Sequence, residues 1–153
     1  MKCIAAAFII SCLMLITQQG VAQNSNYDSV LAKKLQADDY GMKNYVLVIL
    51  KKGTADITDT TQRNNIFRGH MANMGKLAAE NKLSVAGPMG ENDKNYEGIF
   101  VFNTSSIDEA KTWLATDPAF QAKVLDAELY QFYCSAALQQ IPALHEKVQK
   151  KSF

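Results

Sequence analysis

The chain has 153 residues, 48% of them hydrophobic, and a formal net charge of +1. A balanced charge argues against nucleic-acid binding, which needs an excess of basic residues on one face. The length suits a single domain and is sufficient for a substantial core.

The first 22 residues are typical of a secretory signal peptide. Lys2 precedes an apolar run from Ile4 to Ile16, and Gly20-Val21-Ala22 stands where a small-residue cleavage site belongs. This run is shorter than the roughly 20 residues that span a bilayer. We therefore expect export to the periplasm or the medium, with no membrane span. A competing interpretation is a lipoprotein signal whose lipobox, IISC, ends at Cys12.

Cleavage changes the composition of the mature chain in two ways. Because Lys2 leaves with the signal, 15 basic residues stand against 15 acidic ones. Cys3 and Cys12 leave as well, so Cys134 has no partner for an intramolecular disulfide. The apolar strand around Cys134 predicts a small buried residue rather than a nucleophile.

The N-terminal part of the mature chain is predicted to be a helical extension followed by a strand. Residues 23–42 form this extension, because apolar residues recur there at helical spacing up to Leu35. The main domain, residues 43–138, begins with the β-branched run Tyr45–Leu50. Such a run is typical of a central strand that is covered on both faces.

An amphipathic helix is predicted next. Asp59, followed three residues later by Gln62, has the spacing of a capping box. Apolar residues then recur at three- and four-residue steps from Ile66 to Ala78, which predicts a buried stripe. Asn81 stands where the helix ends, and Asn tolerates the left-handed conformation found there.

The rest of the domain is predicted as a hairpin, a helix and a last strand. The hairpin strands are residues 83–86, broken by Gly87-Pro88, and residues 96–102. Ser106 caps the next helix, which ends near Asp117 because Pro118 disfavours helical geometry before it. A helical turn is expected over residues 120–125, a strand over 129–135, and a C-terminal helix within residues 139–153.

This order predicts an α+β fold, the βαββαβ ferredoxin-like sandwich with extra N- and C-terminal helices. Two helices would cover one face of the sheet. Six aromatic side chains are more than burial of one sheet face requires. We therefore expect the second face to be buried in a homodimer. The alternative is that the terminal helices cover this face. These six residues are Tyr45, Phe100, Phe102, Tyr130, Phe132 and Tyr133.

Several short motifs occur in the order and spacing of a known family. They are Arg68-Gly69-His70, Glu80-Asn81-Lys82-Leu83, Ala86-Gly87-Pro88, Asp108-Glu109-Ala110 and Asp117-Pro118. Over residues 43–138 the chain therefore resembles the YciI-like (YCII-related) family, although Asn81 replaces a frequent Gly. Flanking segments such as Asp39-Tyr40-Gly41-Met42-Lys43 are similar to exported members from Bacteroidota-type bacteria.

The resemblance implies the dimeric α/β-barrel form of the ferredoxin-like fold and an acid-base pair of one histidine and one aspartate. By motif these are His70 and Asp117. The family's chemistry is mostly unassigned, with lyase or isomerase character suspected. Fold therefore transfers better than activity.

His70 interrupts an apolar stripe, where a polar ring needs a partner. A carboxylate from Asp117 would fix its tautomer and prepare the other nitrogen for acid-base work. The alternative is a core histidine whose hydrogen bonds are satisfied, with Asp117 only capping the turn at Pro118. Sequence spacing leaves both open.

Weaker candidates for substrate binding share a polar group or a position near the expected site. Arg68 suits an anion, although a solvated arginine is commoner. Gly87-Pro88 would shape a strand end, or form an ordinary turn. The full set is Arg68, Asn73, Gly87, Pro88, Tyr133 and Ser135.

No metal or other cofactor is expected. His70 and His145 are the only histidines, and neither has a second ligand at metal-site spacing. Phosphate loops and nucleophile elbows are not found. Two hypotheses remain: an enzyme or binder for a small organic molecule, and a noncatalytic dimeric interaction module.

Overall fold

The computed structural model describes residues 24–151 of the protein. The predicted signal peptide at residues 1–22, with Cys3 and Cys12, lies outside the described residues. Within the described range, no helix has the length and apolar character needed to cross a membrane.

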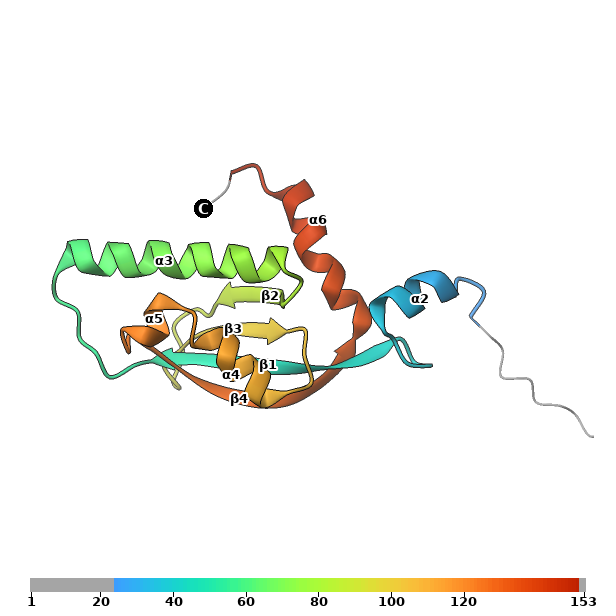
Figure 1. Ribbon diagram of the computed structural model, residues 1–153, viewed down its shortest axis with the longest axis horizontal. Coiled ribbons are helices and arrows are strands. Elements are labelled where there is room, and N and C mark those ends of the chain that lie inside the picture. Colours follow the sequence, from blue (N-terminus) through green and yellow to red (C-terminus); the bar gives the residue numbers. More distant parts are fainter. Residues whose placement is uncertain (1–23, 152–153) are drawn as a thin grey trace, which may run out of the picture.

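A four-stranded antiparallel sheet forms the centre of the domain (Figure 1). Its strands are β1 (Met42–Lys52), β2 (Leu83–Pro88), β3 (Tyr96–Phe102) and β4 (Leu125–Ser135). The spatial order is β2-β3-β1-β4, so β1 is a central strand, as predicted. Together with the helices between the strands, this order confirms the ferredoxin-like α+β fold.

The helices begin and end at the expected chemical signals. They are α2 (Ser29–Leu35), α3 (Thr60–Ala79), α4 (Ile107–Leu114), α5 (Pro118–Gln121), the 3₁₀-helix η1 (Ala136–Gln140) and α6 (Ile141–Val148). The Asp59 carboxylate accepts from the Gln62 amide at 2.6 Å, which confirms the predicted N-cap of α3. Likewise, the Ser106 hydroxyl accepts from the Glu109 amide at 3.1 Å. Asn81 has φ +56°, the left-handed conformation predicted after α3.

Two element boundaries were predicted wrongly. The helical turn expected over residues 120–125 is α5, which starts directly at Pro118, and β4 already begins at Leu125. Lys123 has φ +55°, a conformation that ends the turn early. Gly87-Pro88 does not break β2, because β2 is an edge strand, where proline is tolerated.

The hydrophobic core lies between the helices and one face of the sheet. Alternate residues of β1, from Val46 to Leu50, share this face with Phe100 and Phe102 of β3. They pack against Leu77 of α3 and Trp113 of α4, and the Phe102 and Trp113 rings meet edge to face at 5.4 Å. Leu77 and Trp113 are therefore buried, as their helical spacing predicted.

The opposite face of the sheet, called the open face below, is covered at one end only. Tyr45 is fully buried there, and its hydroxyl donates to the Ser135 carbonyl at 3.0 Å. The adjoining η1 contacts β1 and β2. Farther along β1, Leu47 and Ile49 are only half-buried. The prediction of a strand covered on both faces is therefore wrong beyond Tyr45 in this single chain.

The apolar stripe of α3 is buried over its C-terminal half alone. Leu77 is buried and Met74 packs against the core, whereas Phe67 is 61% exposed. In Figure 1 the N-terminal end of α3 extends past the strands, so the sheet offers no packing surface there. Cys134, predicted to be buried, is a free thiol of intermediate exposure.

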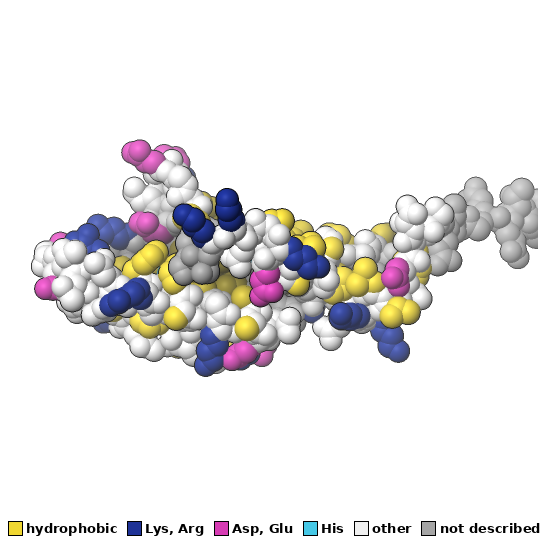
Figure 2. All heavy atoms as spheres, turned by 90° about the horizontal axis from the view of Figure 1, so that it is seen from above, with side chains coloured by type: hydrophobic (Ala, Val, Ile, Leu, Met, Phe, Trp, Pro, Cys, Tyr) yellow, Lys and Arg dark blue, Asp and Glu magenta, His cyan; other side chains and the backbone are white. Residues whose placement is uncertain are grey.

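Charges of both signs are interspersed over the surface shown in Figure 2. No single-sign field covers this face, which agrees with the nearly balanced charge of the sequence.

Gly69 permits the close approach of α3 to α5. A Cβ built on Gly69 would lie 2.9 Å from Cγ of the Pro118 ring, whereas one built on Gly75 in the same helix would meet nothing within 4 Å. Both glycines lie within α3. They therefore form a matched pair for measuring how tightly the two helices pack.

We expect Gly69→Ala to be about 1–3 kcal/mol less stable than Gly75→Ala in urea unfolding, which is the cost of overpacking. Both substitutions gain the same helix propensity, about 1 kcal/mol, so their difference isolates the contact with Pro118. Equal stability of the two variants would show that α5 moves aside without cost.

Candidate functional site

His70 and Asp117 meet between α3 and the start of α5. The distance between His70 Nδ1 and Asp117 Oδ2 is 2.7 Å. Both side chains are largely removed from water, with 12% of the His70 side chain and 2% of the Asp117 side chain exposed. The two residues are 47 positions apart in the sequence, so the packing of α3 on α5 creates this contact.

Asp117 makes two contacts at once, one with His70 and one with the first turn of α5. Its Oδ1 accepts from the Ala119 amide at 2.8 Å and caps α5, while Oδ2 accepts from His70. A buried carboxylate is stable in the charged form only when such donors replace water. The cap therefore also fixes the orientation of the oxygen that holds the histidine.

The His70 ring has an apolar face and a solvent-accessible nitrogen. It stacks on Phe100 at 6.0 Å between centroids, with an angle of 24° between the planes. Nε2 makes no hydrogen bond within residues 24–151, and it is not among their buried unpartnered atoms. This nitrogen therefore contacts solvent. The Ala86 side chain pairs with Phe100 on the helix-covered face of the sheet and is exposed, so the helices leave this face uncovered at Ala86.

The contact with Asp117 determines which nitrogen of a neutral ring carries the proton. An ionised carboxylate only accepts, so Nδ1–H donates to Oδ2 and Nε2 keeps its lone pair. A lone pair at the solvent side can take a proton from a bound molecule. The geometry thus suits a general base that becomes a general acid after it is protonated.

Asn73 lies one helical turn beyond His70 on α3. Its Oδ1 lies 3.0 Å from the Thr116 hydroxyl, whose single proton also has the Trp113 carbonyl within 2.7 Å. Its Nδ2 is buried and has no hydrogen-bond partner in the described part of the chain. Leaving such a donor unsatisfied costs about 1–3 kcal/mol. An oxygen atom of a bound molecule or of water would satisfy it.

The other predicted residues do not join this pair. Arg68 is exposed, and its guanidinium donates to Asn65 on the outer side of α3. Gly87 and Pro88 lie in β2, and Gly87 pairs with Ile99 on the open face. The carbonyl of Gly87 lies 2.6 Å from where a Cβ of Gly98 would stand, so these residues shape the sheet edge.

Tyr133 and Ser135 lie at the far end of the sheet. Tyr133 pairs with Asn44 in β1, four residues from Val48, the partner of Phe100. Four residues along a strand span roughly 13 Å. The Ser135 hydroxyl accepts from the Ala137 amide at 3.3 Å and caps η1. These two residues therefore belong to another surface, and ligand binding by them stays a prediction.

Two residues that shape the site were not predicted from the sequence. Gly69 lets Pro118 approach α3, and Phe100 supplies the surface beneath the imidazole. The Gly69 signal was present, because a helix-interior glycine next to a polar residue in an apolar stripe indicates close packing. Across residues 24–151 there is no cluster of three His, Cys, Asp or Glu side chains able to hold a metal ion.

The fold and this site define a ferredoxin-like α+β domain with a histidine-aspartate pair between a long helix and a short one. The chain belongs to the YCII-related domain family, whose model matches residues 43–132. No curated protein matches the chain.

One similar solved structure is 5-chloro-2-hydroxyhydroquinone dehydrochlorinase from Burkholderia phenoliruptrix AC1100, in complex with 2,5-dihydroxybenzoquinone. The two chains are 22% identical, and the match covers 57% of this chain and 92% of that one, with a TM-score of 0.41. A likeness at this level does not bear on the activity of the present chain.

Two substitutions of Asp117 should separate its two roles. Asn caps helices about as well as Asp, so Asp117→Asn should keep α5 while removing the charged acceptor for His70. Asp117→Ala should lose the cap as well and be about 1 kcal/mol less stable than Asp117→Asn. Urea unfolding measures this difference.

The tautomer of His70 provides the second measurement. In the parent protein, ¹⁵N spectra of the imidazole should show the proton on Nδ1 in the neutral ring. In Asp117→Asn this preference should weaken, since a side-chain amide can donate as well as accept. A parent ring with its proton on Nε2 would contradict the assignment.

Proposed function

We propose that this protein binds and transforms a small organic molecule by acid-base chemistry at His70, with Asp117 as the positioning residue. The observation that carries the proposal is the 2.7 Å contact between His70 Nδ1 and a carboxylate whose other oxygen is already held by Ala119. Such a carboxylate cannot rotate away without uncapping α5. The imidazole ring is therefore held in one orientation before a ligand binds, which favours a catalytic role over a purely structural one.

In the proposed reaction, Nε2 takes a proton from a C–H or O–H group of the substrate. The imidazolium that forms is stabilised by the carboxylate of Asp117. Return of the proton to another atom gives an isomerisation, and delivery of the proton to a departing group gives an elimination. The reaction is therefore of isomerase or lyase character.

Asn73 supports this chemistry with its unsatisfied donor. Abstraction of a proton next to a carbonyl or phenol places negative charge on oxygen, and a fixed N–H group directed at that oxygen stabilises the charge. Nδ2 of Asn73 is a buried, unpartnered donor three residues beyond His70 on α3, and it would reach a substrate oxygen after a side-chain movement that exposes it. We assign it the role of holding the substrate oxygen.

The proposal includes a homodimer formed through the open face. Half-buried Leu47, Ile49, Ile99 and Phe132 share this face with Tyr130, which is 50% exposed. An apolar sheet face without cover is stabilised by a second copy of itself. We also propose that the protein acts outside the cytoplasm, on the basis of its first 22 residues.

A noncatalytic dimeric module is the second candidate function. It is favoured by the open face and by the close stacking of His70 on Phe100, which suits a core residue. In that case the polar ring only costs stability. Replacement by an apolar residue would then stabilise the protein.

We expect His70→Asn to lower turnover by about 10²–10⁴-fold, the usual contribution of a general base. Substrates are found beforehand by thermal-shift screening of small organic acids and phenols, because a ligand stabilises the native state according to its affinity. His145→Asn, at an exposed histidine on α6, is the matched control and should leave turnover unchanged.

The result for His70→Leu distinguishes the two candidate functions. An active site predicts loss of ligand-induced thermal shifts in this variant. The noncatalytic module instead predicts a more stable protein whose responses to every compound equal those of the parent. Parent-like turnover in His70→Asn would refute the acid-base role.

Ile99→Lys should convert the dimer into a monomer, because it places a charge in the centre of the buried face. Light scattering after size-exclusion chromatography measures the mass of each form. Val148→Lys, at a 79% exposed position on α6, should leave the dimer intact. A monomeric parent would contradict the proposed assembly.

A further inference from the structure

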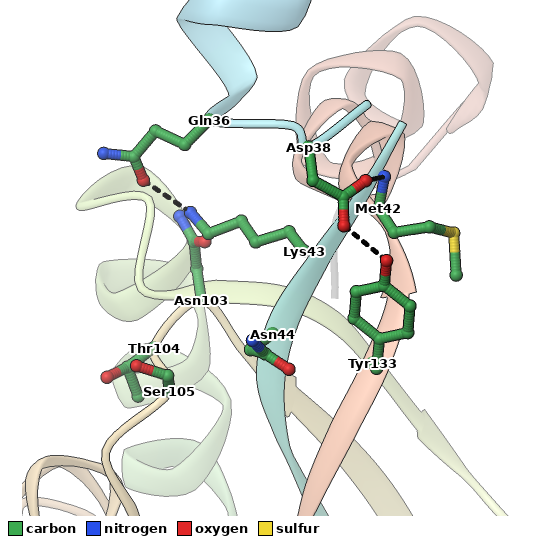
Figure 3. A pocket seen from close by; sticks show the side chains of 9 residues that line it. All are labelled: Gln36, Asp38, Met42, Lys43, Asn44, Asn103, Thr104, Ser105 and Tyr133. Carbon is green, nitrogen blue, oxygen red and sulfur yellow. Dashed lines mark hydrogen bonds between the residues drawn. The ribbon is translucent and has the colours of Figure 1, made fainter. Parts of the chain in front are cut away.

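A second candidate site lies at the end of the sheet opposite to α5. A cleft of about 440 Å³ opens there between the loop after α2, the start of β1 and the loop after β3. Its walls include Lys43, Asn44, Ser105 and Tyr133 (Figure 3). This volume is in the range of small-molecule sites, about 300–1,000 Å³.

Lys43 supplies a cation without an anionic partner. Its ammonium donates to Gln36 Oε1 at 2.8 Å and lies 3.5 Å from Gln139 Oε1, and both acceptors are uncharged. Among the described residues, no carboxylate forms an ion pair with Lys43. Burial lowers the pKa of Lys43, so its charged form is held at a cost that a bound anion would offset.

Asp38, the acidic residue that lines this cleft, forms hydrogen bonds to groups other than Lys43. Asp38 Oδ1 accepts from the amides of Tyr40 and Met42 at 2.9 Å each, and Oδ2 accepts from the Tyr133 hydroxyl. In Figure 3 the Lys43 ammonium bonds to Gln36, whereas Asp38 bonds to Met42 and Tyr133. Positive and negative charge therefore stand on different walls, and the cation remains available.

We infer that this cleft binds a small organic carboxylate, with its charged end on Lys43 and its body between the start of β1 and the loop after β3. An ammonium and a carboxylate form a charge-assisted hydrogen bond, which is stronger than the bond to a neutral amide oxygen. Without a ligand, Gln36 and Gln139 hold the ammonium in place. The cleft is larger than a simple inorganic ion needs, which favours an organic anion.

The inference does not depend on His70. The cleft lies beside α2, whereas the histidine-aspartate pair lies beside α5 at the other end of the sheet (Figure 1). Binding at Lys43 should therefore survive His70→Asn unchanged. Failure of either proposal leaves the other standing.

Calorimetric titration of the full chain with benzoate tests the inference, with benzamide as the uncharged isostere and inorganic phosphate as a compact anion. Benzoate should bind saturably, and Lys43→Gln should weaken it roughly tenfold or more through loss of a charged hydrogen bond. Lys111→Gln removes an exposed cation on α4 and should leave the affinity unchanged.

The pH dependence gives a readout that a structural role of Lys43 would not produce. Benzoate stays ionised from neutral to alkaline pH, so its affinity should fall as pH rises through the lowered pKa of Lys43. Benzoate should in turn raise that pKa by linkage. Equal binding of benzoate and benzamide, tighter binding of phosphate, parent-like affinity in Lys43→Gln, or no saturable benzoate binding would each overturn the inference.

Discussion

The structure depends on one carboxylate that does two things at once. Asp117 caps α5 through one oxygen and holds the His70 ring through the other, while it is 1% exposed. Removing either donor would leave a buried charge partly unsatisfied, which is costly. The position of α5, the packing of α3 on it and the orientation of the imidazole are therefore coupled, and Gly69 makes this coupling possible by admitting the Pro118 ring.

The sheet divides the molecule into regions that differ in burial and polarity. Its helix-covered face holds the core, which ends at Phe100 beneath the imidazole. Its open face holds a half-buried apolar surface that suits a second copy of the chain. The end where β1 begins carries a polar cleft that the N-terminal extension helps to form. The histidine-aspartate pair and this cleft therefore lie at opposite ends of the sheet.

Local chemistry made most of the secondary structure readable from the sequence. Asp59 and Ser106 cap helices through their own side chains, and Asn81 ends α3 in the left-handed conformation. These signals depend on neighbours a few residues away. The start of β4 was misjudged because it depends on pairing with Lys52, which no local pattern encodes.

The sequence by itself determined the order of strands and helices, hence the fold class. It singled out His70 as a polar residue in an apolar stripe, and the family motif pointed to Asp117 as its partner. Only the tertiary structure decided that the two touch, because their contact depends on the close packing of helices far apart in the chain. It also decided that Tyr133 belongs with Asp38 at the other end of the sheet. Side-chain spacing specifies which face a residue occupies, whereas proximity between elements arises from the packing of the whole core.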